Sequence, residues 1–455
     1  MSLGPREWWR PDDGPESHRR PEPAAGAAPE ASDSALSFWL LMVFTLILLL
    51  APQTFVPALM PLRLALLTST AAIAAHLIHR WTRGQPLIVF TPELRIVAGL
   101  IGWAILTVPL SYWPGGSIGF LLNSYFKTIA IFWLVSATVS TVTRLRQVAW
   151  ALSLMAVPLA ASGVREYLSG EFVQGRINGF DAPLTANPND LALMLNLILP
   201  LMVALFTIQS RALVRAGLLA VIFLDAIAVI LTFSRGGFLT LATTIVLYTR
   251  AWSKRSWGWT FAVLTVLLLG MFLLPSSYLD RLATITEIDA DSTGSAQKRW
   301  SDLIAGVNFV LQHPIVGAGV GMNVLALHEE TGTSWNPVHN VFLEYALELG
   351  VPGLVLFLLL YVTCVRSSTS IERRAAGEPA RRELFALAEG IRISLIGFGV
   401  AALFHPVGYN FVFYYFGGLA IALRSIALVE EGVHGPPASL RPSENPIGPV
   451  SLAAR

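Results

Sequence analysis

The chain has 455 residues, of which 54% are hydrophobic and only 13% are charged. Soluble globular proteins carry about 25% charged residues, so this composition excludes an ordinary soluble protein. The single cysteine, Cys364, excludes an intrachain disulfide and a multi-cysteine metal site, and the net charge of +2 is too small to indicate a class of partner.

Apolar runs near 20 residues long recur along the chain, which is the length needed to cross roughly 30 Å of hydrocarbon. They lack the alternating polarity of a membrane barrel. The sequence therefore predicts an all-α polytopic membrane protein with about twelve transmembrane helices. The expected spans are 36–52, 56–78, 93–112, 118–140, 146–163, 190–207, 213–232, 236–250, 258–275, 351–365, 387–404 and 410–429.

The two ends of the chain differ from the rest in composition. Residues 1–35 and 430–455 are polar and rich in proline, so both are expected to be disordered tails. The first apolar run begins too late for an ordinary cleavable signal peptide. Between the tails we expect nine spans over 36–275 with an outer loop near 164–189, a large outer loop over 276–350, and three spans over 351–429.

The basic residues predict the orientation of these spans, because cytoplasmic loops carry an excess of lysine and arginine. With the amino terminus in the cytoplasm, 21 of the 31 basic residues fall in inner segments and six in outer ones. Every inner loop is then basic. Both termini are expected in the cytoplasm, and the long loop is expected on the outer, periplasmic face.

The long outer loop carries its own helix signals. Residues 297–312 have apolar side chains at helical spacing, from Trp300 to Leu311, and His313-Pro314 is expected to end that helix. The glycines of 317–321 predict a flexible turn. A second short helix is expected after Pro337, with its carboxyl-terminal cap at Gly350.

Three arginines on the outer side indicate a partner anion, because a guanidinium at the hydrocarbon boundary needs one. Arg176 lies in the earlier outer loop, Arg235 begins a span beside two glycines, and Arg299 opens the amphipathic helix. The alternative for each is snorkelling, or a salt bridge with a loop acid such as Asp280 or Asp302.

His339 stands at the start of a helix and precedes Asn340, a good amino-terminal cap. A histidine there can accept or donate a proton near neutral pH. The alternative is a surface histidine that serves only helix entry. Glu344 and Glu348 share a helix face and either could pair with a loop arginine, although a solvated or ion-paired face is the expectation for Glu344.

Other polar residues carry weaker signals. The glycine run does not indicate a nucleotide site, because no strand precedes it. Lys127 and Asp225 lie within spans, where each could partner the other or line a polar cavity. His405-Pro406, at the outer end of the penultimate span, is expected to be a pair of loop residues. No metal-ligand cluster or nucleic-acid signal is present in the sequence.

An ordered set of short motifs resembles the O-antigen ligase and polymerase superfamily of bacterial membrane glycosyltransferases. The motifs are Arg176 with Asn187-Pro188-Asn189, Ser234-Arg235-Gly236, Arg299-Trp300 followed by His313-Pro314 and Gly317-Ala318-Gly319, and His339-Asn340 with Glu348-Leu349-Gly350 and Gly353. The resemblance covers roughly residues 120–425.

The resemblance implies a fold of the C-type glycosyltransferase kind and a glycan donor carried on undecaprenyl diphosphate at the outer face of the inner membrane. It implies that Arg176, Arg235 and Arg299 bind the diphosphate and that His339 lies at the reacting centre, with Asn340 and Glu348 in support. Fixed guanidiniums can stabilise the leaving diphosphate, so neither a metal nor another cofactor is expected. Direct attack by the acceptor would invert the anomeric centre.

Four functions remain open. The leading one is a ligase that transfers a glycan to a lipid A–core sugar. A polymerase or an O-linked protein glycosylating ligase would use the same donor, because donor chemistry is shared within the superfamily. A transporter is the alternative from another class, although no internal repeat supports it.

Overall fold

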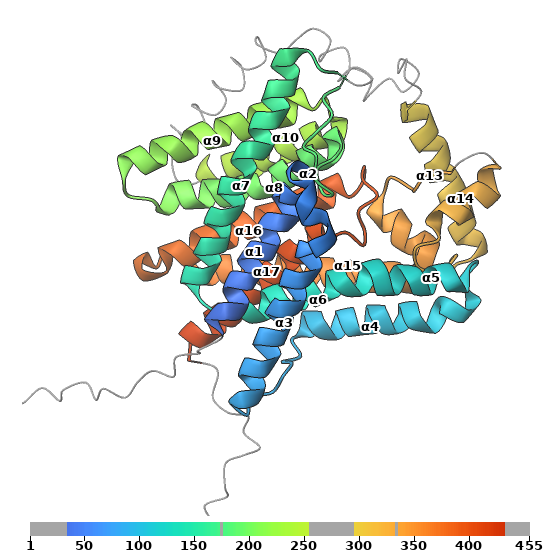
Figure 1. Ribbon diagram of the computed structural model, residues 1–455, viewed down its shortest axis with the longest axis horizontal. Coiled ribbons are helices and arrows are strands. Elements are labelled where there is room, and N and C mark those ends of the chain that lie inside the picture. Colours follow the sequence, from blue (N-terminus) through green and yellow to red (C-terminus); the bar gives the residue numbers. More distant parts are fainter. Residues whose placement is uncertain (1–33, 173–175, 254–294, 333–334, 433–455) are drawn as a thin grey trace, which may run out of the picture. The chain divides into compact units, whose positions relative to one another are not determined.

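A computed structural model describes residues 34–172, 176–253, 295–332 and 335–432. Over these residues the chain is helical and forms no strand (Figure 1). The helices are α1 (Ala35–Leu50), α2 (Pro52–Phe55), η1 (Pro57–Leu62), α3 (Leu64–Thr82), α4 (Pro92–Thr107), η2 (Val108–Leu110), α5 (Pro114–Phe120), η3 (Leu121–Tyr125), α6 (Phe126–Thr138), α7 (Val142–Ser169), α8 (Pro188–Ile208), α9 (Ala212–Leu231), α10 (Arg235–Ser253), α13 (Ser295–Gln312), α14 (Asn323–Thr331), α15 (Val341–Ala375), η5 (Pro379–Arg381), α16 (Arg382–Ala401) and α17 (Phe411–Glu430).

Nine helices among the described residues are long and apolar enough to cross a membrane. They correspond to nine of the twelve expected spans, which confirms a polytopic helical membrane protein. The expected span 36–52 is the shorter apolar helix α1. The expected span 236–250 is α10, which is not among the nine. The expected span 258–275 and both expected tails lie outside the described residues, apart from the short stretches 34–35 and 430–432.

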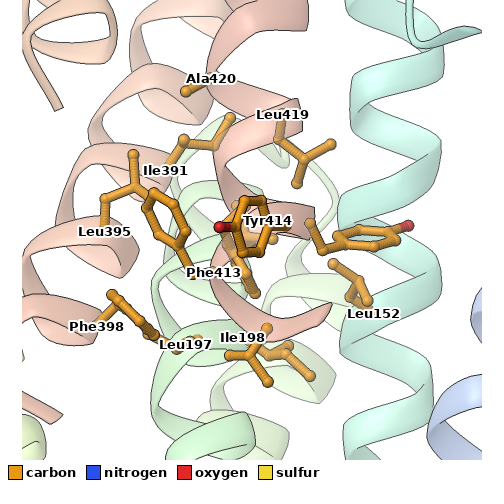
Figure 2. Packing of buried hydrophobic residues seen from close by; sticks show 14 of the residues in the cluster. Leu152, Leu197, Ile198, Ile391, Leu395, Phe398, Phe413, Tyr414, Leu419 and Ala420 are labelled. Carbon is orange, nitrogen blue, oxygen red and sulfur yellow. The ribbon is translucent and has the colours of Figure 1, made fainter. Parts of the chain in front are cut away.

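Helix α8 lies at the centre of the helix packing. Every residue from Leu191 to Leu205 is buried, as expected for a helix that is apolar on all sides. It packs against α7, α9, α10 and α16. Figure 2 shows the core where side chains of α8, α16 and α17 meet, among them Leu197, Phe398 and Phe413.

The helix that follows the long loop is broken at Gly350. This residue has φ +66° and ψ −173° inside α15, so the helical backbone is interrupted there as the sequence predicts. The helical path resumes beyond the break instead of ending, and α15 continues to Ala375. A Cβ atom at Gly350 would lie 2.2 Å from the Ile315 carbonyl oxygen, so only glycine fits this close approach.

The glycine run 317–321 is hydrogen-bonded to the residues of α15 on the amino-terminal side of the break. The backbone N–H groups of Ala318 and Gly319 donate to the carbonyl oxygens of Leu347 and Glu348, at 2.7 and 2.9 Å. Val351 N–H donates to the Pro314 carbonyl at 2.8 Å. The expected flexible turn is therefore a fixed turn, since its glycines permit backbone hydrogen bonds to α15.

Five connections meet at one end of the helix bundle, which we call the loop end. The α4–α5 and α13–α14 connections are joined by the bond from Tyr112 N to Ala318 O, at 2.9 Å. Val341 N donates to Ala402 O at 2.8 Å, which joins α15 to the α16–α17 connection. The α7–α8 and α9–α10 connections join the same group through the side-chain hydrogen bonds of Arg176, Ser234 and His405. The side of the membrane that this end faces stays a prediction.

Ion pairs gather at the opposite end. Arg146 pairs with Glu383 at 2.9 Å, and Arg374 pairs with Glu431 at 3.2 Å. Arg382 donates to the Thr207 carbonyl. These bonds join the ends of α7, α8, α15, α16 and α17. The α6–α7, α8–α9 and α15–α16 connections beside them are all basic in the sequence.

Candidate active site

Asn189 connects three segments at the loop end. Its Oδ1 accepts from Nη2 of Arg176 at 2.8 Å and from Oγ of Ser234 at 2.9 Å. Arg176 also donates through Nε to the Thr232 carbonyl, at 3.2 Å. The position of Asn189 is fixed because Asn187 caps α8 and accepts from the N–H groups of residues 189 and 190. Arg176 is thereby held against the start of α10.

Arg235 is the first residue of α10 and follows a tight backbone turn. Phe233 has φ +52°, which a non-glycine residue adopts at a cost. Gly237 lies against α8, where a Cβ atom would come within 2.6 Å of the Ala192 Cβ. At Gly236 a Cβ atom would lie 3.3 Å from Cε1 of His405. The two glycines therefore bring the α10 start close to both α8 and the α16–α17 connection, as the sequence predicts.

His405 is buried beside this turn, with 2% of its surface exposed. Nδ1 lies 3.0 Å from the Ala401 carbonyl and Nε2 lies 3.1 Å from the Asn189 carbonyl. Both partners accept only, so the doubly protonated ring satisfies this geometry in full. The pKa of His405 is nevertheless lowered, chiefly by burial, although these two bonds and the Asp190 carboxylate oppose that shift. His405 therefore lies in a loop, as expected, but it is a buried loop residue with a hydrogen-bond partner at each ring nitrogen.

His339 lies in the same electrostatic environment. Burial lowers its pKa to about 4, and the electrostatic influence of Arg299 and of His405 acts in the same direction. The ring is therefore neutral near pH 7. Its Nδ1 is buried and has no hydrogen-bond partner among the described residues. A neutral, unpartnered ring nitrogen can accept a proton or donate one to an anion.

The structure thus gathers the predicted residues around the loop end. Arg299 is close enough to His339 to shift its pKa, and His405 links His339 to the Asn189 connection. The residues on either side of Arg235 contact the same group, since Ser234 donates to Asn189 and Gly236 lies close to His405. All four predicted basic residues, including Arg176, are partly exposed. Their roles in binding or catalysis stay predictions.

The two supporting residues have structural partners. Asn340 caps α15 and accepts from Leu343 N–H at 3.0 Å, which confirms the predicted cap. Glu348 is fully buried and accepts from Gly321 N at 2.7 Å and from both nitrogens of Asn323, at 3.2 and 2.5 Å. These hydrogen bonds take the place of the expected pairing with a loop arginine, which is wrong for the residues that the structure describes. It anchors the glycine turn to α15 instead.

The expectation of a solvated Glu344 is also wrong. Its side chain is 6% exposed, and Oε2 accepts from Gly408 N–H at 2.9 Å. Lys127 and Asp225 are not partners of each other, because neither oxygen of the fully buried Asp225 has a partner among the described residues. Lys127 lines a cavity, which was the second alternative from the sequence.

Sequence reasoning missed His405 and Asn189 as members of the site. Asn189 was visible only within a three-residue motif, which was quoted for the family resemblance and was given no separate role. His405 was expected to be a loop residue and was given no further role. A histidine between two apolar helices, on the side where the arginines gather, was the available signal.

Within the described ranges no group of three histidine, cysteine or acidic side chains could hold a metal ion. Residues 218–358 match the family model described as O-antigen ligase. The match confirms the resemblance to the O-antigen ligase and polymerase superfamily over that segment, which includes Arg235, Arg299 and His339. No curated protein matches the chain.

Proposed function

We propose, from the premise that this chain is a member of the O-antigen ligase and polymerase superfamily, that it transfers a glycan from undecaprenyl diphosphate to a lipid A–core sugar. The transfer takes place at the periplasmic face of the inner membrane, on a C-type glycosyltransferase fold. One observation carries the proposal: Arg299 and His405, from two other segments, both lower the pKa of His339, and His405 lies beside the start of α10.

The positive side chains supply what this reaction needs. As the glycosidic bond breaks, negative charge grows on the leaving diphosphate. Arg235 and Arg299 bind that diphosphate, and Arg176 holds the Asn189 connection beside it. Guanidiniums at fixed positions stabilise the growing charge without reorganisation. The reaction is metal-independent in this proposal, so transfer should persist in excess EDTA.

The transfer is a single displacement. The acceptor hydroxyl oxygen attacks the anomeric carbon as the bond from that carbon to the diphosphate oxygen breaks. The bonding pair leaves on the diphosphate, and the acceptor proton passes to His339. Attack from the opposite face inverts the anomeric centre. A neutral His339 suits the proton transfer, because its ring already has the base form near pH 7.

The test is transfer by purified full-length protein, with a synthetic undecaprenyl-diphosphate glycan as donor. Arg235→Ala and Arg299→Ala should each lower the rate by at least two orders of magnitude, in the range of a lost oxyanion donor. Arg235→Lys should rescue poorly, since it lacks the bidentate fork. Arg211→Ala, at the opposite end of the bundle, is the matched control.

Near-normal rates in both arginine variants would show that the diphosphate is bound elsewhere. A polymerase is the second candidate, because it would use the same donor and the same arginines. Lipid analysis of a deletion strain distinguishes the two. A ligase leaves full-length glycan on the carrier lipid, whereas a polymerase leaves single repeats.

A further inference from the structure

A polar cavity of about 350 Å³ adjoins the candidate active site. Small-molecule sites usually measure roughly 300–1,000 Å³. Its polar lining includes Asn123, Ser124, Lys127, Glu344 and Asn410. None of the arginines discussed above lines it, and α8 and α10 do not contribute to it.

The cavity is next to the reacting centre because it uses the same segments. Pro406 lines the cavity and directly follows His405. Glu344 lines it from the first turn of α15, which Asn340 caps directly after His339. Leu184 lines it from the α7–α8 connection, which leads to Asn189. A ligand there could reach His339 from a different set of helices than the arginines.

The helix on one wall is distorted at this cavity. Residues 121–125 form a π-helical turn between α5 and α6. Such turns are rare and occur most often at functional sites. Asn123 and Ser124 belong to the turn, and Lys127 follows it. All three are exposed on a candidate membrane span, where uncovered polar groups are costly unless a polar ligand covers them.

Asn410, on the other wall, has a side-chain oxygen that is not used by the protein's own hydrogen bonds among the described residues. It occupies the amino-terminal cap of α17, where asparagine normally bonds to its own helix. Here its side chain makes no capping bond, and its buried Oδ1 has no partner among the described residues. The partner of Glu344 is the backbone of Gly408, and no described acid forms an ion pair with Lys127.

We infer that this cavity is the subsite for the second substrate, and that it takes the anionic saccharide headgroup of a lipid-anchored glycan acceptor. Lys127 binds the anionic group as a point charge, while Asn123, Ser124 and Asn410 hydrogen-bond sugar hydroxyls. The exposed polar face on a membrane span indicates entry from the lipid side. This inference rests on the proposed function, because a transferase must bind an acceptor as well as a donor.

The test uses full-length protein in detergent with lipid A–core glycolipid, intact and chemically dephosphorylated, as the two acceptor probes. Lys127→Ala should weaken binding of the intact glycolipid at least tenfold and raise its KM by a similar factor. The dephosphorylated glycolipid should bind weakly to wild type and be insensitive to Lys127→Ala. The Kd for undecaprenyl diphosphate alone should stay within twofold.

Two further variants protect the test from misfolding. Lys127→Arg keeps the charge and should restore most of the affinity, and Asn410→Ala should weaken both acceptor probes. The inference is overturned if Lys127→Ala leaves acceptor binding unchanged, or if it weakens undecaprenyl diphosphate binding instead. Delipidated core saccharide that binds as tightly as the glycolipid would overturn lipid anchoring. Absence of transfer with intact acceptor binding would refute the proposed function and leave the subsite standing.

Discussion

At the scale of single residues, His339 is the group whose protonation the structure fixes most directly. Its pKa near 4 keeps the ring neutral over the physiological range. If His339 takes the acceptor proton, its titration should leave kcat/KM unchanged above about pH 6. Below that, kcat/KM should fall as the pH drops toward 4 and the ring becomes protonated. A bound diphosphate raises the pKa of a neighbouring histidine, so the acid limb of kcat should lie at higher pH.

The pH profile of His339→Ala checks this prediction. The variant should retain a small residual rate and lose the acid limb. A wild-type limb that persists unchanged in the variant would assign the titration to another group. The same shift affects stability, because the unfolded histidine has its ordinary pKa of 6.5 and binds more protons than the folded one between pH 6.5 and 4. The free energy of unfolding therefore decreases as the pH is lowered from 6.5 to 4 and increases as the pH is raised through that window.

Glu348 illustrates a residue that supports the site without touching substrate. Its two oxygens accept three hydrogen bonds from Gly321 and Asn323. Glu348→Gln replaces one acceptor by a donor that faces other donors, so we expect a loss of roughly 2 kcal/mol in the free energy of unfolding. Thermal unfolding in detergent measures it. An unchanged unfolding temperature together with a large loss of kcat would instead place Glu348 in the chemistry.

The sequence could identify the charged members of the site but not their partners. Arg176, Arg235 and His339 were visible because charge is rare in this chain and because orientation could be inferred from the basic loops. Glu348 was misjudged because helical spacing shows which face a side chain shares and not what packs on that face. The partners of Glu348 lie 25 and 27 residues away, in a loop whose path no local pattern fixes.

At the scale of elements, the break in α15 depends on glycine for two separable reasons. Gly350 has a positive φ, and a Cβ atom there would collide with the Ile315 carbonyl. Gly332 has a similar φ of +68° and open space where a Cβ atom would stand. Gly332→Ala should lower the free energy of unfolding by roughly 1–2 kcal/mol, which is the cost of a left-handed backbone at a non-glycine residue. Gly350→Ala should lower it clearly more, because the steric collision is added.

Unfolding temperatures of the two variants, measured side by side in detergent, separate these terms. Equal losses would mean that the contact between Gly350 and Ile315 relaxes without cost. The contrast matters for the site, because the break positions the first turn of α15, and with it Asn340 and Glu344, against the α16–α17 connection.

Hydropathy alone predicted the approximate positions of the apolar helices that correspond to expected spans. The sequence predicted α13 within two residues of its observed start, yet it did not predict α14 or the π-helical turn. Neither has a strong periodic signal, because α14 is short and its order depends on packing against α13 and α15. The sequence offered a cavity at Lys127 as one alternative, but it could not identify the other walls, because some of them come from segments more than 200 residues away.

At the scale of the whole molecule, the predicted orientation can be tested through the connections that the structure groups together. Reporter fusions within 177–187 and 402–410 should report the periplasm. Fusions after Arg83, Gln209 and Ala376 should report the cytoplasm, because those connections carry the basic residues. Alkaline phosphatase and green fluorescent protein give opposite readouts for the two sides. A cytoplasmic signal from the first group would reverse the topology.

The loop end also presents an apolar stripe along α13. Trp300, Ile304, Val307 and Leu311 follow one another at helical spacing, and each is more than 40% exposed. The opposite side of the helix is closed against α15, where Gly306 admits Leu343. A stripe of this kind lies in the boundary between lipid headgroups and acyl chains. We therefore expect the bilayer to cover this stripe and to set the height of Arg299 above the hydrocarbon. Turnover should then depend on lipid packing as well as on substrate.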